Sequence, residues 1–417
     1  MPNLGLRSSL KSTGLVAPGI IRDSLVLKHD YIADSVVPVS DGACKFNGTS
    51  DYIAIGAKPV DTADATYCFW ANSTVTGVNS AVFSHVGDSV GAFHFNASSN
   101  RPLLYLEGSL YKYWVDTSAQ DDGNWHHWAV VVDISSMADS KLYVDGIEIA
   151  QDSVVTTGTI NSYGNLEIGR GTSSTEWEGY LCNFGVWSGL LSQAEIKSIM
   201  WKNYSDLSTV QKEYKGGLVS WWNLDEGLDA EDGDLGTKKY HAVDNHDSTV
   251  GPELNTHDNA TNPSSDTNSL TGWVNTDMNT FEASNTYSTV GSYSLHVTSV
   301  DADDHCASTA FTTEAGALYR ISWDFKITNH DGTSKMAFRL GTSGTYGLAA
   351  NYDLADYRSN QIAPSDTDWV SVVKYFIADS TTTYFSLKEI GSGNDPDCYL
   401  DNLSLKKVSG GNPGTLL

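Results

Sequence analysis

The sequence predicts an all-β protein built from two β-sandwich domains. Short apolar-alternating runs recur along the chain, with turn dipeptides such as Asp145-Gly146 and Asn47-Gly48 between them. The chain holds 12 Trp, 21 Tyr and 37 Gly, and this composition favours short strands over helices. At 417 residues it is also too long for one ordinary core. Together these features indicate two sandwiches rather than one.

The predicted strands and the segments between them divide the chain into five parts. Residues 1–24 lack periodicity and predict an extended N-terminal docking arm, and residues 25–207 carry the strand-like runs of a first sandwich. Residues 208–255 predict a linker that contains one extra strand, GGLVSWWNLDEG, and an acidic loop. Residues 256–408 carry the runs of a second sandwich, and residues 409–417 predict a polar C-terminal tail.

One helix is predicted, in LSQAEIKSIMWKNY. Ser192 and Glu195 have the spacing of a capping box, and Ile196, Ile199 and Met200 follow at helical spacing.

The run DDGNWHHWAVVVD, residues 121–133, raises the question of a metal site, because it holds adjacent histidines. Neighbours in a strand point to opposite faces. Trp128, Val130 and Val132 therefore share a face with His126, whereas His127 lies on the other. Two such histidines cannot hold one metal ion together. We expect one face to line the core and the other to be partly solvated.

Several runs in chain order resemble the laminin-G-like, concanavalin-A-type lectin/glucanase sandwich. They cover about residues 25–207, and they are ACKFNGTSDYIAIG, GNWHHWAVVVD, KLYVDGIEIA, NLEIGRG and EGYLCNFGVWSGLLSQAEI. The resemblance implies a sandwich fold, sugar binding, and a calcium ligand at Asp51.

Residues 256–408 resemble the jelly-roll carbohydrate-binding modules that accompany cellulases and xylanases. The matching pieces include GSYSLHVTS, LYRISWDFKI and the closing run CYLDNLSLKKV. In such modules the aspartate at the position of Asp401 helps to bind a structural calcium with a glutamate from the first strand. Here Pro263-Ser264-Ser265 stands where that glutamate would be. Structural calcium is the only cofactor that either resemblance suggests.

The whole layout resembles virion proteins of marine tailed phages, mainly through residues 1–55. This implies a non-enzymatic structural protein on the virion surface, either a head decoration or a tail or fibre adhesin. Its partners would be other virion proteins, further copies of itself, and host-surface glycans. The alternatives are a secreted glycan-binding accessory protein of a polysaccharide-degrading system and a concanavalin-type glycoside hydrolase.

Net charge, hydropathy and cysteine content argue against several classes of partner and location. The formal net charge is −26, and such a surface repels nucleic-acid backbones. No apolar run approaches the ~20 residues of a membrane span, and the N-terminus lacks the apolar region of a secretory signal. The five cysteines are dispersed in apolar runs, which favours free buried thiols. We therefore expect no nucleic-acid partner, no membrane span and no signal peptide.

Catalytic motifs are missing from the sequence. Glycosidases need two carboxylates flanking the scissile bond, and no strand carries the E-x-D-x-x-E run of concanavalin-type glucanases. Glu167 is a lone acid in its strand, and Glu176 and Glu178 precede a strand in a turn. We therefore expect no enzymatic activity.

Exposed aromatic side chains are the candidates for sugar contact. Two groups are predicted, one near a strand end and one in what reads as a long loop. They are Tyr111, Tyr113 and Trp114 in LYKYWVD, and Tyr346, Tyr352 and Tyr357 in GTSGTYGLAANYDLADYRSN.

Overall fold

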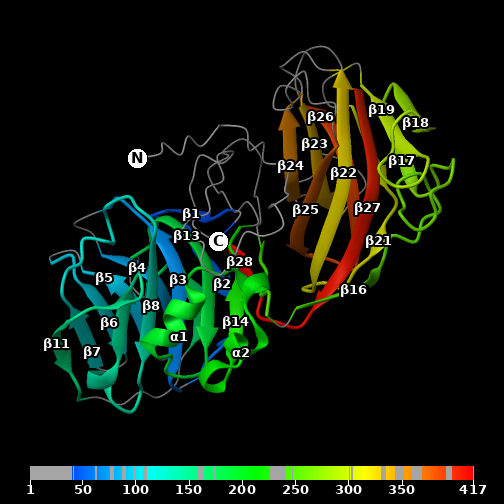
Figure 1. The fold of residues 1–417 in the computed structure, drawn as a ribbon. Coiled ribbons are helices and arrows are strands. Elements are labelled where there is room, and N and C mark those ends of the chain that lie inside the picture. Colours follow the sequence, from blue (N-terminus) through cyan, green and yellow to red (C-terminus); the bar gives the residue numbers. More distant parts are fainter. Residues whose placement is uncertain are drawn as a thin grey trace, which may run out of the picture.

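The computed structural model describes most of the chain. The described residues are 40, 42–61, 63–75, 79–86, 91–96, 99–106, 110–157, 164–171, 175–225, 241–246, 248–299, 301, 304–329, 335–342, 352–358, 369–390 and 397–416. The N-terminal arm, the acidic loop within 226–240 and Tyr346 lie outside them. The described part is all-β, as predicted, and forms two sandwiches (Figure 1).

The first sandwich packs two antiparallel sheets against each other. Sheet A has the order β1 (Cys44–Asn47), β13 (Glu178–Trp187), β3 (Ala65–Asn72), β8 (His126–Val132), β9 (Lys141–Val144), β10 (Ile147–Glu148), and β14 (Leu218–Trp222) also pairs with β13. Sheet B has the order β11 (Gln151–Val155), β7 (Leu110–Trp114), β6 (Pro102–Leu106), β5 (Gly91–Phe95), β4 (Ser80–Val86), β12 (Asn165–Ile168), β2 (Ile53–Ile55), β28 (Gly414–Leu416), β15 (His241–Ala242).

Aromatic rings fill the space between these sheets. Phe184 of β13 stacks on Phe69 of β3 with ring centroids 5.5 Å apart, and its edge meets Phe83 of β4 at 5.7 Å. Trp128, Val130 and Val132 belong to the same core, so one face of β8 lines the core, as predicted.

The other face of β8 differs from the prediction. Ala129 and Val131 are buried, not partly solvated, because helix α1 (Gln193–Ile199) and the chain after it cover this side of sheet A. The Ser192–Glu195 capping box is present, which confirms the predicted helix start. The helix ends at Ile199. Short helical turns follow it in η4 (Tyr204–Asp206), α2 (Thr209–Lys212) and η5 (Tyr214–Gly216); the earlier turn η3 (Met137–Asp139) precedes β9.

The second sandwich also has two antiparallel sheets. Sheet C has the order β18 (Thr280–Ser284), β19 (Ser294–Thr298), β27 (Asp397–Ser409), β22 (Leu318–Asn329), β25 (Val370–Ile377), with β16 (Thr249–Glu253) also on β27. Sheet D has the order β17 (Trp273–Asn275), β20 (His305–Ser308), β26 (Thr382–Ile390), β23 (Lys335–Gly341), β24 (Tyr352–Arg358), with β21 (Phe311–Thr312) also on β26. The inward face of β22 is buried as its alternation predicts, at Tyr319, Ile321, Trp323, Phe325 and Ile327.

Two segments outside the sandwich runs join the first sandwich. The extra strand predicted in GGLVSWWNLDEG is β14, and it extends sheet A beside β13. Residues 409–417 were predicted to be a tail, whereas Gly414–Leu416 form β28 between β2 and β15 of sheet B. The second sandwich is therefore inserted in sequence between strands of the first.

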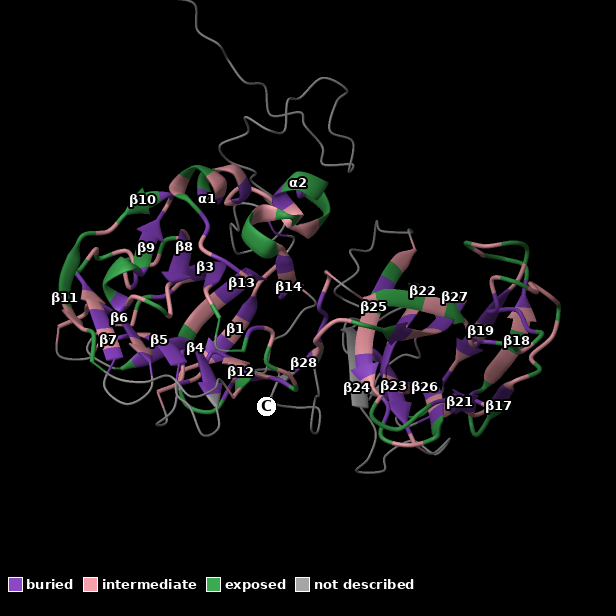
Figure 2. Cartoon of the chain, turned by 90° about the horizontal axis from the view of Figure 1, so that it is seen from below, coloured by how far each residue is buried: buried purple, intermediate pink, exposed green. Residues whose placement is uncertain are grey.

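Burial follows the layers (Figure 2). The strands that face each other inside each sandwich are buried, whereas α2 and the edge strand β11 are largely exposed. All five cysteines are free and buried, as predicted. Among the described residues, none of the helices has the length and apolar character that crossing a bilayer requires.

Truncating Phe184 tests the aromatic core. Phe184→Ala should lower the free energy of unfolding of the first sandwich by about 3–5 kcal/mol, because a fully buried ring is replaced by a cavity. Denaturant titration followed by tryptophan fluorescence measures the change. Val210→Ala, at a side chain 66% exposed, is the control and should shift it by less than ~0.5 kcal/mol. A loss below ~1 kcal/mol at Phe184 would contradict the packing described.

Candidate functional site

The outer face of sheet B carries a cross-strand row of polar and aromatic residues. Glu167 pairs with Ser84, Ser84 with Ala92, Ala92 with Tyr105, and Tyr105 with Tyr111. Partners directly opposite each other in a sheet share a face. Because the residues on either side of Glu167 are in the core, this row points away from the core.

A second row runs beside the first. His94 pairs with Leu103, and Leu103 with Tyr113. The rings of Tyr111 and Tyr113 meet edge to face with centroids 5.6 Å apart. The guanidinium of Arg101 lies 4.7 Å from the ring centroid of Tyr113. Tyrosine faces that are half-buried and already ordered by neighbours form a stacking surface at low entropic cost.

The predicted aromatic group of β7 is therefore split. Tyr111 and Tyr113 lie on this outer face, half-buried. Trp114 points the other way and is 1% exposed within the core. The prediction that Trp114 contacts sugar is not supported, because its ring has no accessible face.

Glu167 and Ser84 have hydrogen-bonding capacity that the chain does not use. Oγ of Ser84 and Oε2 of Glu167 are buried and have no hydrogen-bond partner. Burial raises the pKa of Glu167, and the charge of Arg170 opposes this rise. A buried polar atom without a partner costs about 1–3 kcal/mol. Ser84 is 0% exposed, so its hydroxyl is closed to a ligand. The Glu167 side chain is 14% exposed, and a ligand hydroxyl that bonded to it would recover part of that cost.

Arg170 links Glu167 to a second carboxylate. Its Nε lies 4.0 Å from Oε2 of Glu167 and 3.8 Å from Oε1 of Glu176. Its guanidinium also lies 4.4 Å from the ring centroid of Tyr52. From the sequence, Glu167 was a lone acid and Glu176 lay with Glu178 in a separate turn, so the closeness of Glu167 and Glu176 was not predicted.

His94 is uncharged at neutral pH. Desolvation by burial lowers its pKa to about 4. The ring therefore offers the outer face a neutral donor and acceptor rather than a positive charge.

We call the residues Ser84, His94, Tyr105, Tyr111, Tyr113 and Glu167 the sheet B platform. It combines ring faces with polar atoms that are unsatisfied, on strands that are held by the sheet.

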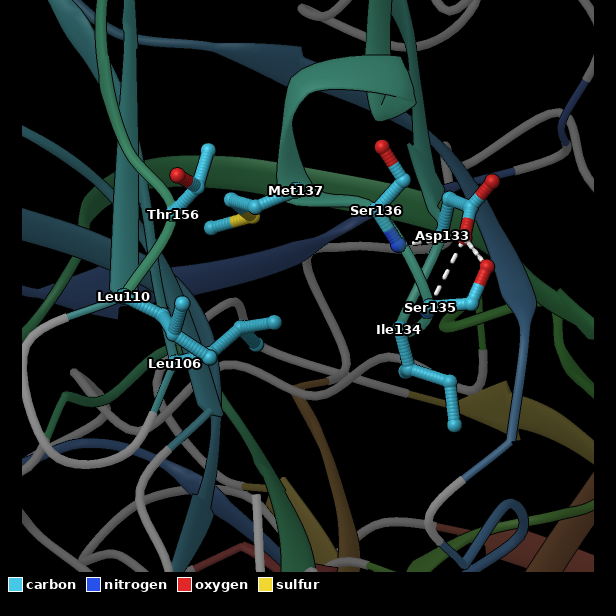
Figure 3. Close-up of a pocket in the computed structure, with 8 residues that line it drawn as sticks. All are labelled: Leu106, Leu110, Asp133, Ile134, Ser135, Ser136, Met137 and Thr156. Atoms are coloured by element: carbon cyan, nitrogen blue, oxygen red, sulfur yellow. Dashed lines mark hydrogen bonds between the residues drawn. The ribbon is translucent and has the colours of Figure 1, made fainter. Parts of the chain in front are cut away.

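A cavity of about 360 Å³ opens at one end of the first sandwich (Figure 3). Leu106, Leu110 and Met137 form its apolar side. On the polar side, Oδ1 of Asp133 accepts bonds from the backbone N–H groups of Ser135 and Ser136, each at 2.9 Å. The turn is thus satisfied internally, and the cavity contains none of the predicted site residues.

The histidine pair is structural. His127 is buried, its ring meets Trp70 edge to face at 5.5 Å, and desolvation lowers its pKa to about 4. His126 lies at the sheet end, where its Nδ1 is 2.7 Å from Oδ2 of Asp145 and its Nε2 is 3.2 Å from Oδ2 of Asp122. Across the described residues, no three His, Cys, Asp or Glu side chains are grouped in a way that could hold a metal ion.

The two predicted calcium ligands accept hydrogen bonds from the chain. Oδ2 of Asp51 accepts from the backbone N–H of Asn47 at 3.1 Å. Oδ2 of Asp401 accepts from the backbone N–H groups of Thr289 and Val290 at 2.6 and 3.0 Å, and from the Thr289 hydroxyl at 3.0 Å. Each carboxylate thereby closes a loop. Calcium binding at either residue stays a prediction.

The second aromatic group was predicted to lie in a loop. Tyr352 and Tyr357 instead lie in β24, at the edge of sheet D, where the backbone register pairs them with Leu340 and Met336. Tyr346 lies outside the described residues. The structure therefore does not join this group to the sheet B platform.

Comparison with known proteins agrees with the fold. Residues 47–197 match the family described as the Concanavalin A-like lectin/glucanases superfamily. This range lies inside the first sandwich and confirms the central part of the resemblance drawn from sequence. No curated protein matches the chain.

Solved structures similar to parts of the chain include the following three. A heptameric SAP-like pentraxin from Limulus polyphemus is 17% identical, with 39% of this chain and 82% of that chain covered at a TM-score of 0.32. A putative carbohydrate binding protein from Bacteroides ovatus is 17% identical, covering 49% and 55% at 0.35. A xylan-binding domain from Paenibacillus barcinonensis is 14% identical, covering 39% and 99% at 0.28.

The His126 ion pairs predict a pH-dependent stability. Hydrogen bonds that His126 donates to Asp145 and Asp122, against the effect of burial, raise the pKa of His126 above its ordinary 6.5. This contribution is complete below pH 6.5 and is lost as pH rises through the higher folded pKa. His126→Gln should therefore cost about 1 kcal/mol at pH 6, since the pair is partly exposed, and almost nothing at pH 9. Urea titrations at both pH values measure the difference, and an equal loss at both would contradict it.

Proposed function

We propose that this protein binds glycans, without hydrolysing them, through the sheet B platform. The observation that carries the proposal is that Tyr105, Tyr111 and Tyr113 share one outer face with Glu167, whose Oε2 has no hydrogen-bond partner. Pyranose rings present C–H groups that pack on aromatic faces, and hydroxyls that donate to carboxylates. The platform offers both kinds of contact on one rigid surface. The lectin-type fold of residues 47–197 supports glycan binding in general.

Hydrolysis is the second candidate activity, because Glu167 and Glu176 lie close together. Glycosidases place two carboxyl groups about 5–9.5 Å apart, and both acids here lie within 4.0 Å of Nε of Arg170. However, that guanidinium is the counter-ion of both acids, so both carboxylates are engaged in ion pairs within the chain. Binding without hydrolysis therefore fits the site better.

Replacing platform residues tests binding and hydrolysis separately. A glycan array first identifies a ligand, and calorimetry then measures its Kd. Tyr111→Ala and Tyr113→Ala should each weaken binding about tenfold, ~1.4 kcal/mol, because each removes one stacking face. Glu167→Gln should weaken binding by a similar factor, since an amide accepts hydroxyls less strongly than a carboxylate.

The control is Tyr287→Ala, which removes a half-exposed tyrosine of the second sandwich and should leave Kd unchanged. Reducing ends are assayed in the same samples. Unaltered Kd in all three platform variants would refute the site. Sugar release by the wild-type protein that disappears in Glu167→Gln would show a hydrolase instead.

The proposal places this glycan-binding protein on the surface of a tailed-phage virion. Its support is the sequence resemblance of residues 1–55 to phage virion proteins and the strongly acidic composition. A secreted accessory protein of a polysaccharide-degrading system would share the same platform but would be found free in the medium.

Deletion of residues 1–24 separates these two settings. If the arm docks the protein on a particle, the truncated protein should fold and bind glycan normally but be missing from purified virions. Quantitative immunoblots of particles and of culture medium measure its distribution. Normal incorporation of the truncated protein would contradict the docking role, and wild-type protein found only in the medium would favour the secreted alternative.

A further inference from the structure

Residues 411–416 pack against the first sandwich, and we call the space between β2 and β15 that they fill the groove. In β28, Thr415 pairs with Ala54 of β2 on one side and with His241 of β15 on the other. Figure 1 shows this C-terminal segment leaving β27 of the second sandwich and ending beside β2. The segment therefore has strand neighbours on both sides, and both belong to the first sandwich.

Asn412 fixes the register of the segment. Its backbone N–H donates to Oδ2 of Asp244 at 2.8 Å, and its Nδ2 donates to Oγ of Ser220 at 2.9 Å. Its carbonyl oxygen accepts from Nε1 of Trp222 at 2.8 Å. Asp244 and Trp222 are both 0% exposed. The backbone N–H, the side-chain amide and the carbonyl oxygen of Asn412 thus all form hydrogen bonds with the first sandwich.

Glycine is required at two points in the segment. A Cβ on Gly414 would lie 2.4 Å from Cγ2 of Ile53 and 2.6 Å from Cδ1 of Ile55. Gly411 has φ +69°, and its Cβ would lie 2.9 Å from Cβ of Asp244. The groove consequently selects a sequence with glycine, asparagine and glycine at the first, second and fourth positions, as in Gly-Asn-Pro-Gly.

We propose that this groove is a sequence-selective peptide-binding site, and that a second copy of the chain can fill it with its own C-terminal segment. Every contact described for Asn412 and Gly414 is with the first sandwich, so none depends on which copy supplies the segment. Gly410 and Gly411 both have positive φ and give the connection from β27 the freedom to redirect the strand. Exchange of an identical element conserves all its hydrogen bonds and is favoured by high protein concentration.

The first experiment uses a fluorescent synthetic peptide with the sequence of residues 410–417, GGNPGTLL. The acceptor is the full-length chain with Gly414→Val, whose own segment no longer fits the groove. Fluorescence anisotropy should show saturable binding of one peptide per chain, at least about tenfold tighter than to the wild-type chain, where the native segment competes. Peptides that carry Gly414→Val or Asn412→Ala are the matched controls and should bind at least about tenfold more weakly.

Failure of the peptide to bind either chain at about 1 mM would overturn the proposal, as would equal binding of the Gly414→Val peptide. If the Gly414→Val chain does not fold, a fluorophore placed at the C-terminus of the wild-type chain reports displacement by excess peptide. Absence of displacement then counts against the groove in the same way.

The second experiment tests the copy as the occupant. Two full-length chains with different affinity tags are incubated together at high concentration, and one tag is captured. Wild-type chains should be captured together, and pairs in which both chains carry Gly414→Val should not. No co-capture of the wild-type pair, or undiminished co-capture of the variant pair, would overturn strand exchange. Neither experiment uses a glycan, so a negative result in either one does not bear on the proposed glycan binding by the sheet B platform.

Discussion

The alternation of side chains along each strand is the constraint on which the rest of the structure depends. Neighbouring residues must point to opposite faces, so a sandwich sorts each strand into a buried half and an outer half. In β7 this rule puts Trp114 in the core and Tyr113 on the outer face. In β8 it separates His126 from His127, which excludes a shared metal ion and leaves each ring with a structural role. The sheet B platform forms because side chains alternate in the same register along five paired strands, so their outward-pointing residues line up on one face.

Buried polar atoms of the described residues fall into two groups, those with a hydrogen-bond partner and those without one. Asp244 accepts backbone N–H groups from Trp221, His246 and Asn412. Asp401 is similarly bonded on both oxygens. These carboxylates hold loops and strands together and have donors suited to that task. Oγ of Ser84 and Oε2 of Glu167 are buried without a hydrogen-bond partner, and so are Nε1 of Trp177 and Nε1 of Trp323, which lie outside the platform.

Sequence patterns predicted the features that depend on local periodicity, such as buried strand faces and the helix start. They could not predict the features that depend on which strands pair and in which register. The alternation of β22 and the Ser192–Glu195 capping box were visible because neighbours in sequence define them. The three residues of β28 contain a glycine and have no period to detect, and their strand partner Ala54 is far away in sequence. Tyr111 and Tyr113 could be found as aromatics in a strand. Their neighbours Ser84 and Glu167 could not, since cross-strand pairing alone brings these residues together. The edge position of Tyr352 was missed because turn residues around it gave the appearance of a loop.

The pairing of β2 connects the C-terminal segment to the platform. Ala54 pairs with Thr415 on one side and with Glu167 on the other, and Glu167 pairs in turn with Ser84. The C-terminal strand and the polar end of the platform therefore lie in a single cross-strand row. Hydrogen bonds from β28 cover the edge of β2, a strand of three residues that would otherwise end the sheet. Since β12 pairs with β2 and β4, the position of Glu167 depends on a strand that is itself fixed by the end of the chain. The cross-strand row that contains Glu167 is thus completed by a strand that follows the inserted second sandwich in sequence.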